Sequence, residues 1–436
     1  MQTNFETQLA PLAEQLRSGT LNLMDYLAQL EAYFETENER VQAFLPETNR
    51  FARLRQEASV LEAQFPNPAD RPVLYGIPMG IKDIFHVDGF ETRAGSQLPP
   101  QVLAGPQAES VSQLQRMGAL ILGKTVTTEF AYFGPGPTRN PHNIKHTPGG
   151  SSSGSAAAVG AHLSPLTLGT QTIGSIVRPA SFCGVVGFKP SSGRISTAGV
   201  IPLSPTLDHI GIFTQDVAGA TLAASVLCSD WQTDDSPSVH PTLGIPDGPY
   251  LEQASSEGLV HFQQTVSKLE QAGYTVKTVA AMPDFHDIYV AHNALMAAET
   301  TSVHHDWFAE FGDLYHPKTI DLLERGKKIT LDQIEAARLG REYLRQNLEV
   351  LMDKHNLDLW ISPAAVGTAP AGLESTGDPI MNLPWTYAGV PAINLPSGLG
   401  ENGLPLGLQL AGRDQGDEQL LAWAESIASV LMSFYL

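Results

Sequence analysis

Short apolar runs typical of buried strands alternate with helical patterns along most of this chain, and this alternation constrains its fold more than any other feature. Strands separated by helices in this way pair in a parallel or mixed sheet that the helices cover. The runs that favour strands are 79–85, 119–122, 166–169, 274–279, 357–361, 392–395 and 405–410. The patterns that favour helices are 108–117, 155–161, 216–227, 257–271, 285–311, 331–354 and 418–431. The sequence therefore predicts an α/β fold.

The N-terminal part is expected to be helical. Two amphipathic helices are predicted over residues 5–37, interrupted by a Ser-Gly-Thr turn, and a third over about 48–64. We expect residues 1–68 to form a helical segment packed on the core. Residues 69–436 are expected to form one large domain, because no linker long enough to separate further domains occurs in them. Within this domain, the part at about 283–356 is dominated by helical patterns.

The charge balance and the cysteine content exclude several classes of protein. Lys and Arg number 26 and Asp and Glu number 46, which gives a formal charge of −20. Binding to nucleic acid or to anionic lipid normally requires a surplus of basic side chains instead. Cys183 and Cys228 are too few for a disulfide framework, and neither stands in a CxxC pair that would hold zinc.

The sequence contains no recognisable targeting or membrane-spanning segment. Residues 1–11 include Glu6 and no basic residue, which is unlike a signal peptide. The longest strongly apolar stretch, 217–228, has 12 residues and is too short to span a bilayer. We therefore expect a soluble, cytoplasmic protein that contacts neither nucleic acid nor a membrane.

Two motif matches do not suit their usual functions. Residues 118–125 fit the phosphate-binding pattern GxxxxGK[ST], which needs a flexible loop between a strand and a helix. Here the middle of the match, Ala-Leu-Ile-Leu, is a strand-like run that follows a helical pattern, so we interpret the match as accidental. Residues 150–154 fit the pattern GxSxG, which would make Ser152 a nucleophile. We disfavour this interpretation, because no strand pattern precedes the match and no later acid and histidine complete a triad.

Lys82 interrupts the apolar run at residues 79–85. Gly80 lies on the same face of the expected strand and is expected to leave space beside the lysine. Burial of an ammonium group is unfavourable and lowers its pKa from about 10.4 by up to several units. A neutral lysine can act as a general base at neutral pH. The alternative is a lysine at the end of a strand whose amine reaches water.

Two further segments gather small and polar residues. The first, residues 149–155, combines hydroxyls and glycines directly before an Ala-rich helical run, which indicates a tight loop rather than a flexible linker. In the second, residues 169–179, a strand leads into a turn that contains Gly174 and Ser175. The successive amides near residues 172–175 would form an oxyanion hole if they point together. The alternative is an ordinary buried turn with a capped hydroxyl.

Taken in this order, the three segments resemble the amidase signature family of Ser-cisSer-Lys hydrolases, and the similarity covers most of the chain. Other stretches similar to the family are 123–125, 128–131, 138–141, 148–155, 182–184, 187–190, 198–202 and 403–409. The resemblance implies a single large α/β domain with a central mixed β-sheet covered by helices on both faces. It also implies a cofactor-free amidohydrolase that cleaves a small-molecule carboxamide to a carboxylate and ammonia or an amine.

The resemblance implies a role for each residue that matches the family's motifs. Ser175 matches the nucleophile that forms an acyl-enzyme. Ser151 matches the bridging serine, which the family holds through a cis peptide, and Lys82 matches the base that takes the proton through this serine. The implied oxyanion hole consists of the amides of Thr172, Ile173 and Gly174, and the implied substrate-binding residues are Gly149, Gly150, Gln171 and Arg178.

Three positions depart from the family pattern. The family often has Asp at the position of Gln171, which can still form hydrogen bonds, and Gly at the position of Ile173. Ile173 disfavours a left-handed backbone and is expected to narrow the pocket. Arg178 stands three residues after the nucleophile rather than two, as in some stand-alone amidases. It would there bind a substrate carboxylate through its planar guanidinium, or it is structural and pairs with a backbone or acidic group.

Four histidines stand near aspartates in the helix-rich part, but without the spacing of a metal-binding motif. The resemblance implies no metal, and we interpret these residues as polar positions on helices, some of them near the substrate entrance. They are His286, His292, His304 and His305.

Two other functions are weighed against the stand-alone amidohydrolase. One is a glutamine-hydrolysing amidotransferase subunit of the A type, which acts on charged tRNA only inside a complex. The charge of −20 and the position of Arg178 favour the stand-alone enzyme instead. The other is a catalytically silent scaffold, which the intact set of matching residues disfavours. The acyl group of the substrate is not defined by the sequence, and a homodimer is one of the oligomeric states left open.

Overall fold

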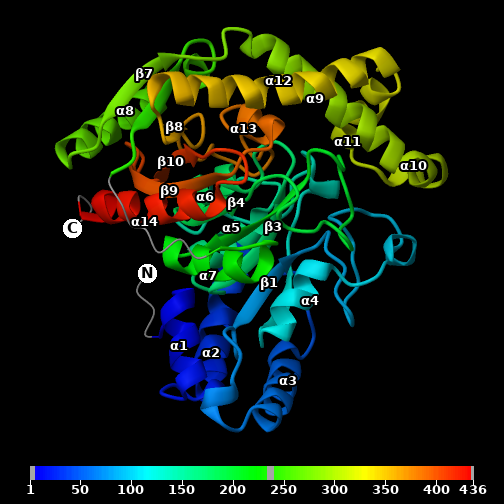
Figure 1. Cartoon of the computed structure of the whole chain (residues 1–436). Coiled ribbons are helices and arrows are strands. Elements are labelled where there is room, and N and C mark those ends of the chain that lie inside the picture. The colour runs from blue at the N-terminus through cyan, green and yellow to red at the C-terminus, as the bar shows by residue number, and fades with distance from the viewer. Residues whose placement is uncertain (1–4, 233–239, 434–436) are drawn as a thin grey trace.

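A mixed β-sheet forms the centre of the molecule (Figure 1). The computed structural model describes residues 5–232 and 240–433, and within them the sheet has ten strands in the order β2-β1-β3-β5-β4-β9-β10-β8-β6-β7. Parallel pairs occupy the two ends of the sheet, and antiparallel pairs connect them. The strands are β1 (Pro78–Lys82), β2 (Leu120–Thr125), β3 (Leu166–Gln171), β4 (Val186–Lys189), β5 (His209–Thr214), β6 (Leu243–Asp247), β7 (Val276–Ala280), β8 (Leu359–Pro363), β9 (Ala392–Leu399) and β10 (Pro405–Ala411).

Helices cover both faces of the sheet, which confirms the predicted α/β fold class. Helices α5 and α6 contact each other and pack on β1, β3, β4, β9 and β10, whereas α7, α8 and α14 form a second contiguous group on β4, β5, β8, β9 and β10. The α-helices are α1 (Leu9–Ser18), α2 (Leu23–Val41), α3 (Arg50–Gln64), α4 (Glu109–Arg116), α5 (Ser153–Gly160), α6 (Val177–Cys183), α7 (Val217–Leu227), α8 (Ser256–Gln271), α9 (Phe285–Val303), α10 (His305–Phe311), α11 (Pro317–Gly326), α12 (Leu331–His355), α13 (Leu383–Ala388) and α14 (Asp417–Ser433).

The N-terminal helices α1 to α3 and the helices α9 to α12 lie at opposite ends of the molecule, with the sheet between them (Figure 1). Helix α3 packs against the edge strand β2, and α1 packs against α7. Apolar side chains of α1 to α3 belong to the same buried cluster as those of the central strands. At the other end, α9 contacts α11 and α12, and both α9 and α12 contact the short helix α13.

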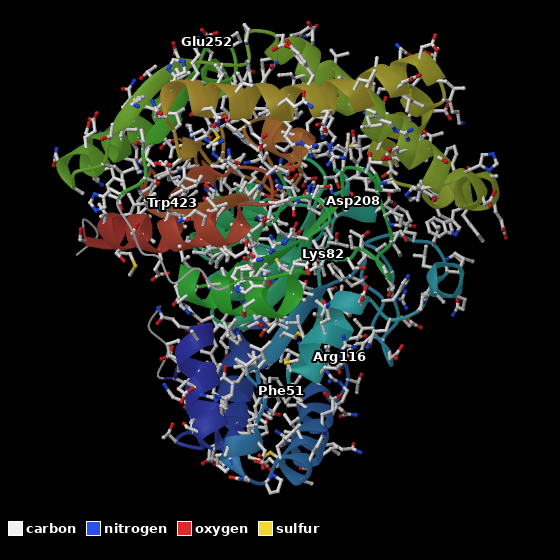
Figure 2. All side chains as sticks on the ribbon, viewed as in Figure 1. Phe51, Lys82, Arg116, Asp208, Glu252 and Trp423 are labelled. Atoms are coloured by element: carbon white, nitrogen blue, oxygen red, sulfur yellow. The ribbon has the colours of Figure 1, made fainter. Side chains whose placement is uncertain are left out.

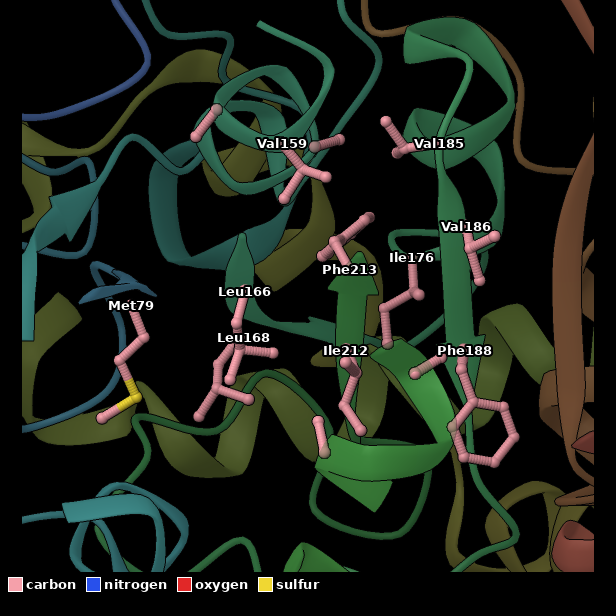
Figure 3. Packing of buried hydrophobic residues seen from close by; sticks show 14 of the residues in the cluster. Met79, Val159, Leu166, Leu168, Ile176, Val185, Val186, Phe188, Ile212 and Phe213 are labelled. Atoms are coloured by element: carbon pink, nitrogen blue, oxygen red, sulfur yellow. The ribbon is translucent and has the colours of Figure 1, made fainter. Parts of the chain in front are cut away.

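The core is continuous across the middle of the sheet. Figure 3 shows Leu166 and Leu168 of β3 beside Ile212 and Phe213 of β5 and Phe188 of β4. Every residue of β3 is buried, including its two threonines and Gln171, as expected for a strand with helices on both faces. Full burial of each large aliphatic side chain contributes about 1.5–3 kcal/mol, so this region anchors the strands that lead to the site described below.

Every run predicted as a strand overlaps a strand of the sheet, but β4, β5 and β6 were not predicted. These three are short or interrupted, since β5 begins with His209 and contains Gly211, and β6 contains Pro246. The prediction of one helix over residues 285–311 is wrong, because α9 ends at Val303 and α10 begins at His305. The residue between them, His304, packs edge-on against Phe130 with the ring centroids 4.5 Å apart, and this tertiary contact accompanies the break.

The two motif matches lie in settings that do not suit their usual functions. Residues 120–125 form the buried strand β2 after α4, so they do not provide the flexible loop that the phosphate-binding pattern needs. No strand precedes the GxSxG match, since residues 138–148 contain only turns and an isolated bridge. Across the ranges 5–232 and 240–433, we find no helix with the length and apolar character needed to cross a membrane.

Candidate active site

Lys82 is the last residue of β1, and its side chain is fully buried near the centre of the molecule (Figure 2). The Nζ atom lies 2.8 Å from the Oγ of Ser151 and 2.8 Å from the Oγ1 of Thr170. The amine therefore does not reach water, which rules out the alternative of a solvent-seeking lysine. The space expected beside Gly80 is absent, because two threonine methyl groups lie 2.9 Å from where its Cβ would stand.

Burial lowers the pKa of Lys82 from 10.5 to about 7, because the charged form loses its hydration. The nearby carboxylate of Asp208 acts in the opposite direction. Burial also raises the pKa of Asp208 from 3.8 to about 6, against hydrogen bonds from the Thr172 hydroxyl at 2.5 Å and from two backbone amides. At neutral pH a substantial fraction of Lys82 is uncharged and able to accept a proton.

Ser151 lies in a tight loop that leads directly into α5, and the Gly150–Ser151 peptide bond is cis. Gly149 has a φ of +84°, a conformation that glycine adopts without steric cost. The carbonyl of Gly149 accepts a hydrogen bond of 2.8 Å from the Oγ of Ser153. This segment is a packed loop rather than a flexible linker, as predicted.

The 172–176 turn connects the end of β3 to the start of α6. Because β1 and β3 are parallel neighbours, their carboxyl ends meet at one edge of the sheet, which brings the turn beside Lys82. The backbone amides of Ile173 and Gly174 have no acceptor among the described residues. Amides in this state can donate to a negatively charged oxygen. Only glycine fits at position 174, since a Cβ there would lie 2.3 Å from the Oδ1 of Asn382.

Ser151 and Ser175 line the same hollow, which encloses about 240 Å³ including its mouth. The side chain of Ser175 is almost fully buried, with 7% of the residue exposed. Ile173 also lines this space and does not have a left-handed backbone. The remaining lining residues are Ala131, Tyr132, Phe133, Thr172, Arg178 and Pro379.

Gln171 is fully buried and does not line the hollow. Its Oε1 accepts hydrogen bonds from the backbone amides of Ile176 at 2.8 Å and Val177 at 3.0 Å, so it caps the start of α6. Its Nε2 donates to the Oγ1 of Thr386 at 2.9 Å. The side chain is therefore engaged at both ends by protein groups, and the predicted contact between Gln171 and a substrate finds no support.

Arg178 lines the hollow and also holds the loop that carries Ser151. Its Nη2 donates to the carbonyl of Gly150 at 2.5 Å, and its Nη1 donates to the carbonyl of Gly377. Its Nε has no partner among the described residues. Burial lowers the pKa of Arg178 to about 10, which leaves the guanidinium charged at neutral pH. Gly149 and Gly150 themselves do not line the hollow, so their predicted substrate contacts find no support either.

The sequence did not indicate three parts of this site, namely Thr170, Asp208 and the wall formed by residues 131–133. Thr170 stands at the carboxyl end of β3, the strand next to that of Lys82, and this placement is the signal that would have found it. Asp208 reaches the site because β5 pairs with β3 so that His209 lies opposite Gln171. The position of Asp208 at the site could not be predicted from the sequence, because β5 was not predicted as a strand.

Two of the four histidines, His292 and His304, are fully buried. The Nε2 of His292 lies 2.9 Å from the carbonyl oxygen of Thr172, and His304 is enclosed by aromatic rings. His286 and His305 are exposed. Within residues 5–232 and 240–433, no group of three or more His, Cys, Asp or Glu side chains is arranged to hold a metal ion.

The chain is similar to known proteins over nearly its whole length. The family described as Amidase matches residues 25–421. The A-type subunit of the glutamyl-tRNA(Gln) amidotransferase of Trichlorobacter lovleyi is 30% identical over 468 aligned residues, which cover 96% of this chain and 96% of that protein. The protein of the same name from Halothermothrix orenii is 31% identical, with 82% of this chain and 85% of that protein covered.

Solved amidase structures have the same fold. A protein described as an amidase superposes with a TM-score of 0.87 at 29% identity, with 98% of this chain and 100% of that chain covered. The native peptide amidase of Stenotrophomonas maltophilia superposes with a TM-score of 0.81 at 25% identity, with 98% and 97% covered. From the family match and these amidase structures we conclude that this chain belongs to the amidase family and is a hydrolase of amide C–N bonds.

Proposed function

We propose that this enzyme cleaves a small-molecule carboxamide through an acyl-enzyme on Ser175, with Lys82 as the base and Ser151 as the bridge between them. The observation that carries the proposal is the 2.8 Å distance from Lys82 Nζ to Ser151 Oγ, at the wall of a hollow that Ser175 also lines. A buried amine with a pKa of about 7, a bridging hydroxyl and a second serine are the groups that such a proton relay needs.

In the proposed mechanism, the Oγ of Ser175 attacks the carbonyl carbon of the amide. Its proton passes to the Oγ of Ser151, whose own proton passes to the Nζ of Lys82. The carbonyl oxygen becomes an oxyanion and accepts hydrogen bonds from the amides of Thr172, Ile173 and Gly174, where each donor contributes about 10²- to 10³-fold in rate. The relay then returns a proton to the leaving nitrogen and the C–N bond breaks. Water attacks the acyl-enzyme by the same relay and releases the carboxylate.

The lining of the hollow indicates which acyl groups it suits. It includes the aromatic residues Tyr132 and Phe133 and the basic residue Arg178. This lining favours planar or anionic acyl groups over long aliphatic chains.

A panel of amides tests the proposal directly. The chain is purified without partners and incubated with aliphatic, aromatic, dicarboxylic and ureido amides, and the product acid is detected by mass spectrometry. We expect turnover of at least one class without any added partner chain. Absence of turnover across the panel, together with no labelling of Ser175 by a fluorophosphonate, would contradict the proposal.

A glutamine-hydrolysing amidotransferase subunit is the second candidate. The observation in its favour is that curated relatives with about 30% identity over almost the whole chain are named as the A-type subunit of glutamyl-tRNA(Gln) amidotransferase. The charge of −20 argues against direct contact with tRNA, so this role would depend on partner chains. Glutamine is therefore included in the amide panel. Slow hydrolysis of glutamine alone, with every other amide inert, would favour the second candidate.

The pH dependence of the reaction follows from the pKa of Lys82. The proposed base acts only when it is neutral, so kcat/KM is expected to rise with pH and to reach half of its maximum near pH 7, the pKa that burial gives Lys82. Because Lys82 must be deprotonated to accept a proton, activity is lost as the pH falls through about 7 and stays constant above about 8. A profile between about pH 5.5 and 9.5 checks this. Activity that keeps rising up to the alkaline end of this range would mean that the base has an ordinary lysine pKa.

Substitution of Arg178 by lysine distinguishes its two roles. Arg178 reaches the carbonyls of Gly150 and Gly377 with two separate nitrogens of its planar guanidinium, whereas lysine has a single nitrogen and cannot reproduce this spacing, so the loop that carries Ser151 is expected to shift. A displacement of about 1 Å can cost about 10²-fold in rate, and we expect this loss in kcat for every substrate of the panel. A loss restricted to amides that carry a carboxylate would instead show that Arg178 acts through the substrate.

A further inference from the structure

Two buried side chains from the C-terminal half of the chain hold carbonyl groups of the 172–176 turn. The Nε2 of His292, on α9, lies 2.9 Å from the carbonyl oxygen of Thr172. The Oγ1 of Thr386, on α13, donates to the carbonyl oxygen of Ile173 at 2.6 Å. Both side chains are fully buried, and neither lines the hollow. They therefore act on the turn without touching a substrate.

The direction of each hydrogen bond follows from the chemistry of its partners. A backbone carbonyl can only accept, so the Nε2 of His292 carries the hydrogen. Gln171 donates from its Nε2 to the Oγ1 of Thr386 at 2.9 Å, which leaves the hydroxyl hydrogen of Thr386 for a carbonyl. The oxygen of Ile173 at 2.6 Å is nearer to this hydroxyl than the oxygen of Asn382 at 3.1 Å. The hydroxyl hydrogen is thus directed at Ile173.

Each held carbonyl shares a peptide unit with an amide of the proposed oxyanion hole. The carbonyl of Thr172 belongs to the unit that contains the amide of Ile173, and the carbonyl of Ile173 belongs to the unit that contains the amide of Gly174. In a planar trans unit the C=O and N–H bonds point in opposite directions. A donor that fixes the carbonyl therefore fixes the direction of the N–H, and it also polarises that N–H and strengthens its hydrogen bond.

We infer that His292 and Thr386 are positioning residues that aim the amides of Ile173 and Gly174 at the oxyanion, and that Gln171 sets the direction of the Thr386 hydroxyl. The inference rests on the proposed function, because it concerns the oxyanion of that reaction. A carboxylate in place of the Gln171 amide has no N–H, so it would accept the hydrogen of Thr386 and leave the Ile173 carbonyl without its donor. The amide of Gln171 therefore keeps the Thr386 hydroxyl available as the donor to the Ile173 carbonyl.

The test compares variants that keep or remove each donor. Thr386→Val and His292→Phe remove the donor, whereas Thr386→Ser keeps the hydroxyl. For the best amide of the panel, we expect each removal to lower kcat by about 10-fold or more, since loss of a whole oxyanion donor costs about 10²- to 10³-fold. KM is expected to stay within about twofold, and Thr386→Ser should recover most of the rate.

A boronic acid with the same acyl chain provides a readout that a purely structural role would not move. Its tetrahedral adduct on Ser175 places an oxygen in the oxyanion hole, so Thr386→Val is expected to weaken its binding by the same factor by which kcat falls. Thr301→Val is the matched control, because this threonine of α9 donates to the carbonyls of Ala297 and Leu323, outside the turn. It should leave kcat and boronic acid affinity unchanged.

The outcomes separate this inference from the proposed function. Unchanged kcat and boronic acid affinity in both Thr386→Val and His292→Phe, in an enzyme that is otherwise active, overturns the inference alone. Equal losses in these variants and in Thr301→Val also overturn it, because they indicate general destabilisation. A native chain that neither hydrolyses any amide nor binds the boronic acid overturns the proposed function and the inference together.

Discussion

Replacement of Ser175 by alanine is expected to lower kcat by at least about 10⁴-fold, because no acyl-enzyme can form without its hydroxyl. The substitution removes one oxygen from a side chain that is almost fully buried and adds no volume to the site. We therefore expect the melting temperature to change by no more than a few degrees. Turnover of the best amide is measured by detection of the product acid, and labelling by a fluorophosphonate is followed by peptide mapping. Both signals should disappear.

Ser152→Ala is the matched control for this experiment. Ser152 lies in the same loop as Ser151, is fully buried, and is the residue that the GxSxG pattern would make the nucleophile. Its Oγ donates to the carbonyl of Thr170 at 3.2 Å, so it is already engaged by the backbone. We expect covalent labelling to persist in this variant. Loss of labelling in Ser152→Ala together with its retention in Ser175→Ala would reverse the assignment of the nucleophile.

Replacement of Lys82 by methionine is expected to lower kcat by about 10²- to 10⁴-fold, the usual contribution of a general base. Methionine has a similar length and no charge, so the variant keeps the volume of the core while it removes the relay. Because a buried amine is costly to desolvate, the melting temperature should not fall. The residual activity should also lose its inflection near pH 7, since the group responsible for it is gone.

A second buried lysine provides the control for this pH profile. Lys189 is fully buried, and burial lowers its pKa from 10.5 to about 7, as for Lys82. It donates to the carbonyls of Pro190 at 3.1 Å and Val390 at 2.6 Å and does not line the hollow. Lys189→Met is therefore expected to keep the inflection near pH 7. If Lys189→Met loses the inflection and Lys82→Met retains it, the base has been assigned to the wrong residue.

The sequence was sufficient to predict the fold class because most strands contain a short apolar run between helical patterns. Strands β1 and β3 are buried along their whole length and were predicted from such runs. The strand β5 was not predicted, because its glycine and its histidine weaken the apolar pattern and its burial is a property of the assembled sheet. Tertiary burial, rather than local propensity, decides such strands.

The same limit applies to the candidate site. Lys82, Ser151 and Ser175 were proposed from motifs, and the structure places Lys82 beside Ser151 and both serines at one hollow. The contacts that Asp208, His292 and Thr386 make at the site join segments that are distant in sequence, so no local sequence pattern predicts them. Gln171 shows the converse, because the family resemblance implies a substrate contact, whereas its side-chain amide is engaged by protein groups on both sides.

The strand order has a consequence for the growing polypeptide. Strand β4 pairs with β9, yet the two are separated by about 200 residues of chain, as the positions of Lys189 and Ala392 show. At a synthesis rate of about 5–20 residues per second, β9 leaves the ribosome about 10–40 s after β4. During this interval one edge of β4 presents unpaired backbone groups, which are a template for pairing with another chain. The strand order therefore gives the nascent chain an unpaired edge at β4 that is covered by β9 in the finished enzyme.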